Sequence, residues 1–338
     1  MKKLLLILLI PMIGFGQNVN IPDANFKAYL VGNSLINTNG DTEIQVSEAS
    51  VFNGSIECGY MNIADLTGIE DFTALTSLNC QSNQLTSLDV SQNIALEFLN
   101  CAGNQLTGLD VSNNTNLTYL ILGTNQLTSL DVSNNLALTD LNCYNNQLTS
   151  LDVSQNTALT TLHCNLNQLT SLDVSQNTAL TTLHCNLNQL TSLDVSQNTA
   201  LAWLDCHNNQ LTSLDVSNNP ALTFLNCSDN LLTSLDLRNG TWHTIFDYFM
   251  KAYNNPSLTC INVDNVAAST AIWTVANNNI DTQHYFSTNC STTGIQEHIT
   301  NKQLLKVTDL LGRETKQTNQ PLFYIYDDGT VEKRIVIE

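Results

Sequence analysis

Residues 148–168 read LTSLDVSQNTALTTLHCNLNQ, and residues 169–189 repeat the same string without a change. The 21-residue period extends in both directions, from about residue 56 to residue 238. A fixed short period predicts a repeat solenoid, in which each turn buries its apolar face only against the turns before and after it. We therefore expect a stack of turns that presents a long surface, and surfaces of this kind bind other molecules.

Each repeat contains two copies of the pattern LxxLxφxxN, where φ is an apolar residue. The last Leu and φ are separated by one polar residue, the alternation typical of a half-buried strand. Each turn is therefore expected to contribute two short strands, which pair with equivalent strands about 4.8 Å away in the neighbouring turns.

Asparagines at the 21-residue spacing form two files at the corners of the turns. We expect their amides to point inward and to satisfy backbone N–H and C=O groups that water cannot reach. The first file contains Asn62, Asn83, Asn104, Asn125, Asn146, Asn167, Asn188, Asn209 and Asn230, and the second contains Asn93, Asn114, Asn135, Asn156, Asn177, Asn198 and Asn219.

Residues 159–169, LTTLHCNLNQL, carry the pattern LxxLxCxxNxL, which recurs about nine times over residues 56–238. This pattern resembles the leucine-rich repeat family in its short 21-residue bacterial form. The resemblance implies a leucine-rich repeat solenoid, and the pattern within each repeat predicts two short parallel β-ladders.

Residues 1–17 contain Lys2 and Lys3, followed by the apolar run LLLILLIPMIGF. This order is typical of a secretory signal peptide, and the run is too short to span a membrane. We expect export, and no other stretch is apolar enough to predict a transmembrane segment.

Residues 18–55 are expected to cap the first repeat. The stretch IPDANFKAYLVGNSL places Phe26 and Leu30 one helical turn apart. The next segment, NTNGDTEIQVSE, resembles an EF-hand calcium loop whose candidate ligands are Asn37, Asn39, Asp41, the carbonyl of Glu43, and Glu48. Asn replaces the usual first Asp, and Thr42 replaces the usual Gly. Weak calcium binding and a purely structural cap therefore both remain open, and no cofactor is required.

Eight of the ten cysteines fall in one inward column, comprising Cys58, Cys80, Cys101, Cys143, Cys164, Cys185, Cys206 and Cys227. Side chains stacked in register point the same way, which is poor geometry for disulfides, so we interpret them as small apolar core residues. Cys260 and Cys290 lie outside the period. We expect them to form a disulfide that closes a C-terminal cap over residues 239–292.

The formal net charge is −19, and no Lys or Arg occurs between Lys27 and Arg238. This argues against nucleic acid and anionic membranes as partners. One outward file contains Asp89, Asp110, Asp131, Asp152, Asp173, Asp194, Asp215 and Asp236. Neighbouring carboxylates about 5 Å apart repel by roughly 1 kcal/mol even in water. We expect flanking Ser hydroxyls and loop N–H groups to offset this repulsion, with bound divalent cations as the alternative.

Residues 299–338 differ in composition from the repeats. Residues 304–338 read LLKVTDLLGRETKQTNQPLFYIYDDGTVEKRIVIE and predict strands separated by turns at Gly312 and Asp328-Gly329. The stretch resembles the C-terminal sorting domain of type IX secretion cargo in Gram-negative bacteria, without its usual YPNP-like start. The resemblance implies a partner in the type IX machinery, export across both membranes, and release or attachment at the cell surface.

No catalytic motif of the GxSxG, HExxH, CxxC or P-loop type occurs, so we predict no enzyme activity. The arrangement nearest to a reactive site is the column Asn142, His163, His184, Asp205 and Asn226, with His207 nearby. Two imidazoles beside a carboxylate suit zinc or copper. However, the two histidines of the column belong to the identical repeats, so duplication alone accounts for their pairing.

The outward positions beside the cysteine column vary from turn to turn, whereas the opposite side repeats Ser-Asp-Ser. A variable side with aligned, exposed aromatic residues suits recognition of a protein, or of a glycan by ring stacking. The candidate ligand-binding residues are Phe98, Tyr119, Tyr144, His163, His184, Trp203, Asp205, His207 and Phe224.

We therefore predict an exported cell-surface or secreted protein with an adhesion, scaffold or adaptor role. The first alternative is a passive or calcium-dependent component of a surface layer. The second is ice binding by the regular Thr file from Thr86 to Thr233, against which the neighbouring aspartates argue.

Overall fold

The computed structural model describes residues 16–240, 249–290, 304–308, 314, 321–326 and 331–335. The chain divides into two units, residues 1–290 and residues 291–338, which are described separately. The expected signal peptide lies almost entirely outside the described residues.

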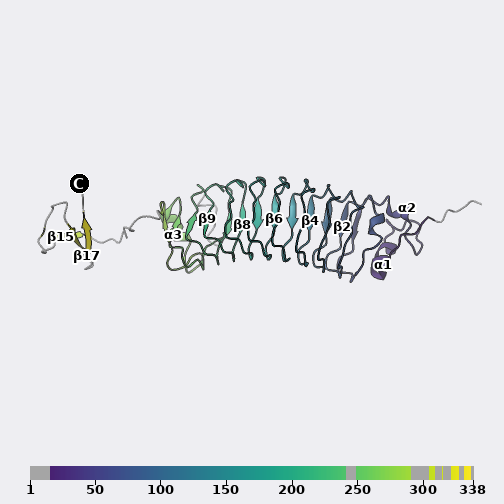
Figure 1. Cartoon of the computed structure of the whole chain (residues 1–338), viewed down its shortest axis with the longest axis horizontal. Coiled ribbons are helices and arrows are strands. Elements are labelled where there is room, and N and C mark those ends of the chain that lie inside the picture. The colour runs from purple at the N-terminus through teal and green to yellow at the C-terminus, as the bar shows by residue number, and fades with distance from the viewer. Residues whose placement is uncertain are drawn as a thin grey trace, which may run out of the picture. The chain divides into compact units, whose positions relative to one another are not determined.

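The first unit is built on a parallel sheet of ten strands, one from each successive turn (Figure 1). Equivalent residues pair across it, as Leu162 does with Leu183, so the register advances by one repeat per strand. The parallel solenoid predicted from the 21-residue period is confirmed. The strands are β1 (Ser55–Glu57), β2 (Ser77–Asn79), β3 (Phe98–Asn100), β4 (Tyr119–Ile121), β5 (Asp140–Asn142), β6 (Thr161–His163), β7 (Thr182–His184), β8 (Trp203–Asp205), β10 (Phe224–Asn226) and β12 (Met250–Lys251).

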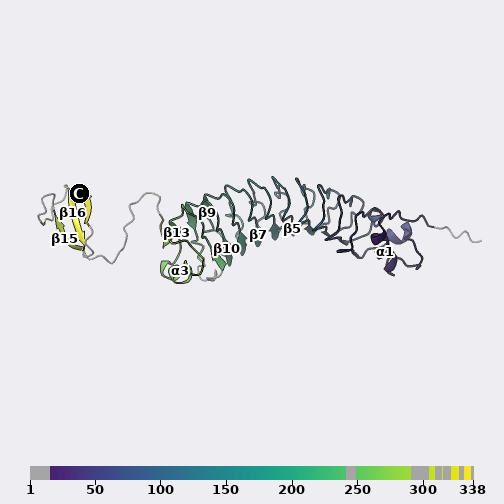
Figure 2. The ribbon, with the colours of Figure 1, turned by 90° about the horizontal axis from the view of Figure 1, so that it is seen from below.

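Within the described residues, a second parallel sheet, separate from the one that contains β10, forms only near the C-terminal end of this unit (Figure 2). It contains β9 (Ser213–Asp215), β11 (Ser234–Asp236), β13 (Cys260–Asn262) and β14 (Tyr285–Ser287), in the order β14-β13-β11-β9. The prediction of a second strand in every turn is therefore wrong for the described turns before residue 213. In those turns the Ser and Asp of each Ser-Leu-Asp segment are exposed, so their backbone groups are open to water and do not require a ladder.

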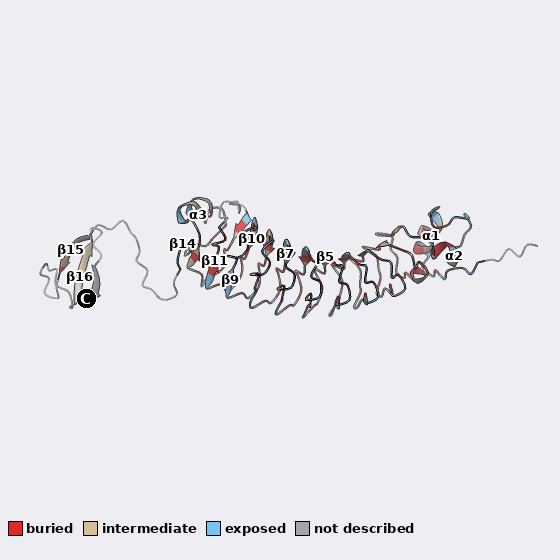
Figure 3. Cartoon of the chain, turned by 90° about the horizontal axis from the view of Figure 1, so that it is seen from above, coloured by how far each residue is buried: buried red, intermediate tan, exposed pale blue. Residues whose placement is uncertain are grey.

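Leu, Val and Cys side chains fill the interior of the turns. On β6, Leu162 is fully buried, His163 is half-buried, and the next residue, Cys164, is fully buried again. The same alternation of buried and partly exposed positions follows the large sheet along the unit (Figure 3). All eight column cysteines are free and buried, as predicted.

The first asparagine file satisfies both kinds of backbone group. Asn167 Oδ1 accepts the N–H of Leu148 at 3.0 Å, and its Nδ2 donates to the carbonyls of Cys143 and Cys164 at 3.0 and 3.1 Å. The same set of bonds recurs in the neighbouring turns. The prediction is wrong for Asn62, which is exposed and has a left-handed backbone with φ of 55°.

The second asparagine file only donates. Asn177 Nδ2 donates to the carbonyls of Val153 and Asn156 at 3.0 and 2.8 Å, but its Oδ1 has no partner among the described residues. The same holds for all seven members of the file. The expectation that these amides satisfy N–H groups as well is therefore wrong, because backbone N–H groups of this corner bond to backbone carbonyls instead, as that of Asn177 does to Val174 at 3.0 Å.

The N-terminal cap begins with the predicted helix, α1 (Ala24–Gly32). The carboxylate of Asp23 caps it by accepting the N–H groups of Asn25 and Phe26, and Phe26 and Leu30 are fully buried. The short helix α2 (Val46–Ala49) and the 3-10 turn η1 (Ile69–Asp71) follow.

The C-terminal cap contains α3 (Val266–Ile272), and Trp273 follows it in the core with 1% exposure. Cys260 of β13 and Cys290 form the expected disulfide. Within the described parts of the chain, no helix has both the length and the apolar character that a membrane span requires.

The second unit contains an antiparallel sheet of β15 (Leu304–Thr308), β16 (Pro321–Tyr326) and β17 (Val331–Ile335), with β16 in the centre. The predicted strands at the end of the chain are therefore confirmed. Their proposed role in sorting is a separate question.

Candidate recognition surface

The ten-stranded sheet aligns the candidate residues in two columns. Its register places Asn142, His163, His184, Asp205 and Asn226 side by side, as the repeat predicted. The outward positions two residues earlier form the second column, which contains Asp140, Thr161, Thr182, Trp203 and Phe224. We call the outward positions of this sheet the variable face.

Four rings form a continuous stack across β6, β7, β8 and β10. The centroids of Trp203 and Phe224 are 3.8 Å apart with 5° between the ring planes, and those of His163 and His184 are 4.5 Å apart at 21°. His184 and Trp203 join the pairs at 6.1 Å and 11°. We call these four residues the aromatic stack. Since strands lie about 4.8 Å apart, rings from adjacent turns meet face to face and direct their edges outward.

The other aromatic candidates also contact neighbouring turns. Phe98 and Tyr119 lie 6.2 Å apart at 41°, and the ring of Tyr144 covers Gly123, where any larger side chain would collide with it. The expectation that the aromatic residues are exposed holds for Tyr119, at 47%. It is wrong for the rest, which are half-buried because each ring packs against the adjacent turn.

His207 lies beside Asp205, with its Nδ1 2.6 Å from Asp205 Oδ1 and 3.2 Å from Asn226 Nδ2. The short contact with a carboxylate directs the Nδ1–H toward Asp205. Burial lowers the pKa values of His163 and His184, although nearby Asp140 and Asp205 oppose the shift. Burial therefore favours the neutral form of both stacked histidines.

The described residues contain no group of three His, Cys, Asp or Glu side chains positioned to hold a metal ion. The zinc or copper interpretation of the histidine column therefore has no support in this geometry. Stacked imidazoles hold their nitrogens in parallel planes, so the two lone pairs do not converge on one ion.

The opposite side of each turn carries the aspartate edge, defined as the file from Asp89 to Asp236. Asp173 Oδ1 accepts the backbone N–H of Ser175 at 2.9 Å, and the same bond recurs at 2.8–2.9 Å from Asp89 to Asp215. The bonds from the Ser175 N–H and hydroxyl lower the pKa of Asp173. The predicted compensation by loop N–H and Ser groups is therefore present.

The candidate calcium loop is closed by its own hydrogen bonds. Glu48 Oε1 accepts the N–H and hydroxyl of Thr38, both at 2.8 Å, and Glu48 Oε2 accepts the N–H of Gln45, which caps α2. Asn37 Nδ2 donates to two carbonyls, Asn39 Oδ1 accepts the N–H of Asp41, and Glu43 pairs with Lys27 at 2.7 Å. The side chains of Asn37, Asn39 and Glu48 thus already make hydrogen bonds within the loop, and calcium binding by residues 37–48 stays a prediction.

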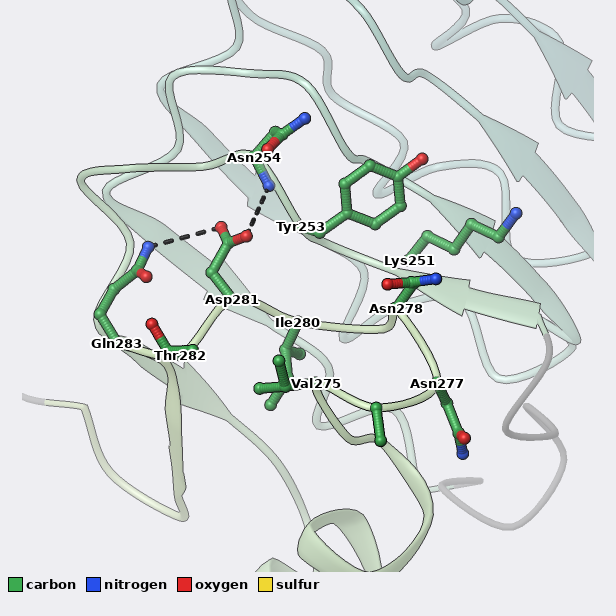
Figure 4. Close-up of a pocket in the computed structure, with 11 residues that line it drawn as sticks. Lys251, Tyr253, Asn254, Val275, Asn277, Asn278, Ile280, Asp281, Thr282 and Gln283 are labelled. Atoms are coloured by element: carbon green, nitrogen blue, oxygen red, sulfur yellow. Dashed lines mark hydrogen bonds between the residues drawn. The ribbon is translucent and has the colours of Figure 1, made fainter.

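Sequence reasoning missed a polar pocket of about 860 Å³ at the C-terminal end of the variable face (Figure 4). Its lining includes Lys251, Tyr253, Asn278 and Asp281. One signal was available, since Phe249-Met250-Lys251 repeats the outward, inward, outward order of the repeat strands outside the 21-residue period.

No family model matches the chain. A solved structure described as the functional domain of InlJ from Listeria monocytogenes, which includes a cysteine ladder, is 38% identical with a TM-score of 0.54. The match covers 74% of this chain and 58% of that one. Curated internalin J from a serotype 4b strain of the same species is 54% identical over 39 residues, 12% of this chain and 4% of that protein.

An internalin C2 structure from L. monocytogenes is 18% identical, with a TM-score of 0.55 over 63% of this chain and 97% of that one, and shows the fold alone. The chain spans less than two thirds of the InlJ structure and a small part of curated internalin J. It is thus similar to internalin-type leucine-rich repeat proteins in its repeats, its fold and its column of cysteines.

Proposed function

We propose that the variable face binds a protein partner, and that the chain is a cell-surface or secreted leucine-rich repeat protein with an adhesion or scaffolding role. It acts by binding, without catalysis. The observation that carries this proposal is the aromatic stack, which gathers large side chains in the C-terminal half of a face whose other outward positions differ from turn to turn. Aromatic residues dominate the energetics of protein interfaces.

The ring geometry favours a protein over a glycan. A sugar that stacks on an aromatic residue needs a free ring face, and the facing surfaces of Trp203 and Phe224 are in contact at 3.8 Å. Ring edges and half-buried apolar area remain, and these suit side chains of a protein. The similarity to the InlJ structure supports the same class of role.

Export is part of the proposal and rests on the signal-peptide pattern of residues 1–17 and the sorting-domain resemblance of residues 304–338. The three antiparallel strands of the second unit are compatible with a small β domain at this position. Deleting residues 304–338 in a bacterium with a type IX system should leave the protein in the periplasm. Unchanged surface display of the truncated chain would contradict this part.

The binding proposal is tested by comparing two faces of one chain. Surface-protein extracts and glycan arrays are probed with the wild type, Trp203→Ala, Phe224→Ala and, as the matched control, Asp173→Asn. We expect either aromatic change to weaken binding of a captured protein by about 1 kcal/mol or more, because each removes half of a stacked pair. The control should bind as the wild type does.

Two outcomes would contradict the proposal. Loss of binding with Asp173→Asn alone would move recognition to the aspartate edge and favour the surface-layer alternative. Glycan capture that survives both aromatic changes would show a different ligand and a different site.

A further inference from the structure

Among the described residues 16–240 and 249–290, one Lys or Arg side chain has no ion pair. Residues 16–290 contain only three Lys or Arg residues. Lys27 pairs with Glu43 at 2.7 Å, and Arg238 Nε bonds Asp236 at 2.9 Å. Within the described residues, Lys251 has neither an ion pair nor a side-chain hydrogen bond, in a chain whose net charge is −19. Its ammonium is therefore an isolated positive charge on an acidic molecule.

The register places this charge at the end of the variable face. Lys251 lies on β12, the last strand of the ten-stranded sheet, and pairs with Asn226 of β10. Met250 is fully buried, so Phe249 and Lys251 both face outward. The ring of Phe249 lies 6.0 Å from Phe224 and extends the aromatic stack toward the lysine.

The pocket beside Lys251 presents donors rather than free carboxylates (Figure 4). Its one acid, Asp281, is engaged with its own cap, because it accepts the N–H groups of Asn254 and Asn255 at 3.0 and 3.1 Å. The side chains of Tyr253 and Asn278, like that of Lys251, make no hydrogen bond within the described residues. An ammonium, a hydroxyl and an amide thus line the same cavity of about 860 Å³.

We propose that this pocket binds the carboxylate of an Asp or Glu side chain of the partner protein, while an adjacent apolar side chain of that partner packs on Phe224 and Phe249. This inference rests on the proposed function and specifies the partner's chemistry. Lys and amide donors complement a carboxylate, and charge-assisted hydrogen bonds are the stronger kind. Because Lys251 lies at one end of the ten-stranded sheet, a carboxylate bound there also fixes the direction in which the partner segment lies along the variable face.

The test uses the whole chain and peptides that have no free C-terminal carboxylate. Random 12-residue peptides, fused to the phage coat through their C-terminal ends, are selected on the immobilised protein. Enriched sequences are then synthesised with amidated C termini, and Kd is measured by fluorescence polarisation. We expect the enriched peptides to combine Asp or Glu with a nearby aromatic or aliphatic residue.

For such a peptide, Lys251→Met should raise Kd at least tenfold, and Lys251→Arg should stay within about threefold of the wild type, because it keeps the charge. Changing the peptide acid to its amide should cause the same loss, with no further loss when combined with Lys251→Met. Lys27→Met serves as the control for charge alone and should leave Kd unchanged.

The result separates this inference from the proposed function. If Lys251→Met leaves Kd unchanged while Trp203→Ala weakens binding, the recognition face stands and the carboxylate pocket is wrong. If neither change alters binding, both are wrong. Enrichment of peptides without acidic residues also overturns the pocket's assignment.

Discussion

The two sides of each turn share one sequence pattern but use their polar side chains differently. On the aspartate edge, Asp173 accepts an N–H from its own turn, and the same bond recurs along the file. On the variable face the equivalent bond is longer, at 3.1–3.3 Å, and is found only in turns that carry Asn or Asp there, such as Asn142 and Asp205. Other outward residues contact the next turn, as His163 does with His184. A residue that closes its own turn needs a side-chain acceptor such as that of Asp or Asn. A residue that only contacts its neighbour is free to differ, provided that the neighbour fits.

This difference explains why one side is uniform and the other variable without any appeal to function on the uniform side. The aspartates are needed where they stand, because they satisfy loop N–H groups at the end of each Ser-Leu-Asp segment. On the variable face Asn142 and Asp205 make the same kind of bond. The described turns with Ile121, His163 or His184 at that position fold without it, so the composition of this face is available for recognition. Each prediction below tests this division.

The largest expected effect concerns the asparagines that end the two halves of a turn. Asn167→Ala, on the side of the variable face, removes one accepted and two donated hydrogen bonds to buried backbone groups. It should lower the free energy of unfolding by about 2–4 kcal/mol. Asn177→Ala removes only donated bonds and also removes an unpaired buried oxygen, so we expect about 1–2 kcal/mol. Urea denaturation measures both.

Asn165→Ala, at a half-exposed position of the same repeat, is the control and should change stability little. A larger loss for Asn177→Ala than for Asn167→Ala would show that the corner beside the aspartate edge supports the turn more strongly. The division between the two sides would then have to be redrawn.

The next effect concerns the apolar columns beneath the two sides. Cys185 lies under the variable face and Val174 under the aspartate edge, and both are fully buried. Cys185→Ser and Val174→Thr each place a hydroxyl in an apolar wall, so both should destabilise the protein by about 1–3 kcal/mol. Comparable losses would show that the cysteine column is a packing element like the valine column.

Thiol labelling gives an independent readout of the same column. Burial raises the pKa of Cys185 above its ordinary value of 9.0, so the folded protein should resist alkylation at pH 8. Denatured, unreduced protein should expose eight thiols, since only Cys260 and Cys290 are paired. Rapid labelling of the folded chain would mean that the column opens to solvent.

The sequence predicted what repetition determines. Every repeat places Cys164 and its equivalents on the same inward position, so the column, its free thiols and the parallel register follow from the period alone. It did not predict ring orientation, because the packing of Trp203 on Phe224 depends on which residues occupy adjacent turns. Nor did it predict the pocket beside Lys251, since the C-terminal cap has no period from which to read a register.

The smallest expected effect concerns calcium. Calcium binding by the aspartate edge would contradict the division into a structural side and a binding side. The aspartate edge already receives N–H and Ser hydrogen bonds, and Glu48 already caps α2. We therefore expect millimolar calcium to leave the melting temperature unchanged. Asp152→Asn, which keeps the Oδ1 acceptor, should melt close to the wild type, whereas Glu48→Ala should melt lower with or without chelator because Thr38 and Gln45 lose their acceptor.

Any ion that prefers the folded state must raise its stability, by about 2.7 kcal/mol at a hundredfold excess over Kd, so the result is decisive. A calcium-dependent rise that Glu48→Ala abolishes would establish the loop of residues 37–48 as the calcium site that its sequence resembles. A rise that Asp152→Asn reduces would place cations along the aspartate edge. That edge would then be a binding surface in its own right, and uniformity within a solenoid could no longer be taken as the mark of a purely structural side.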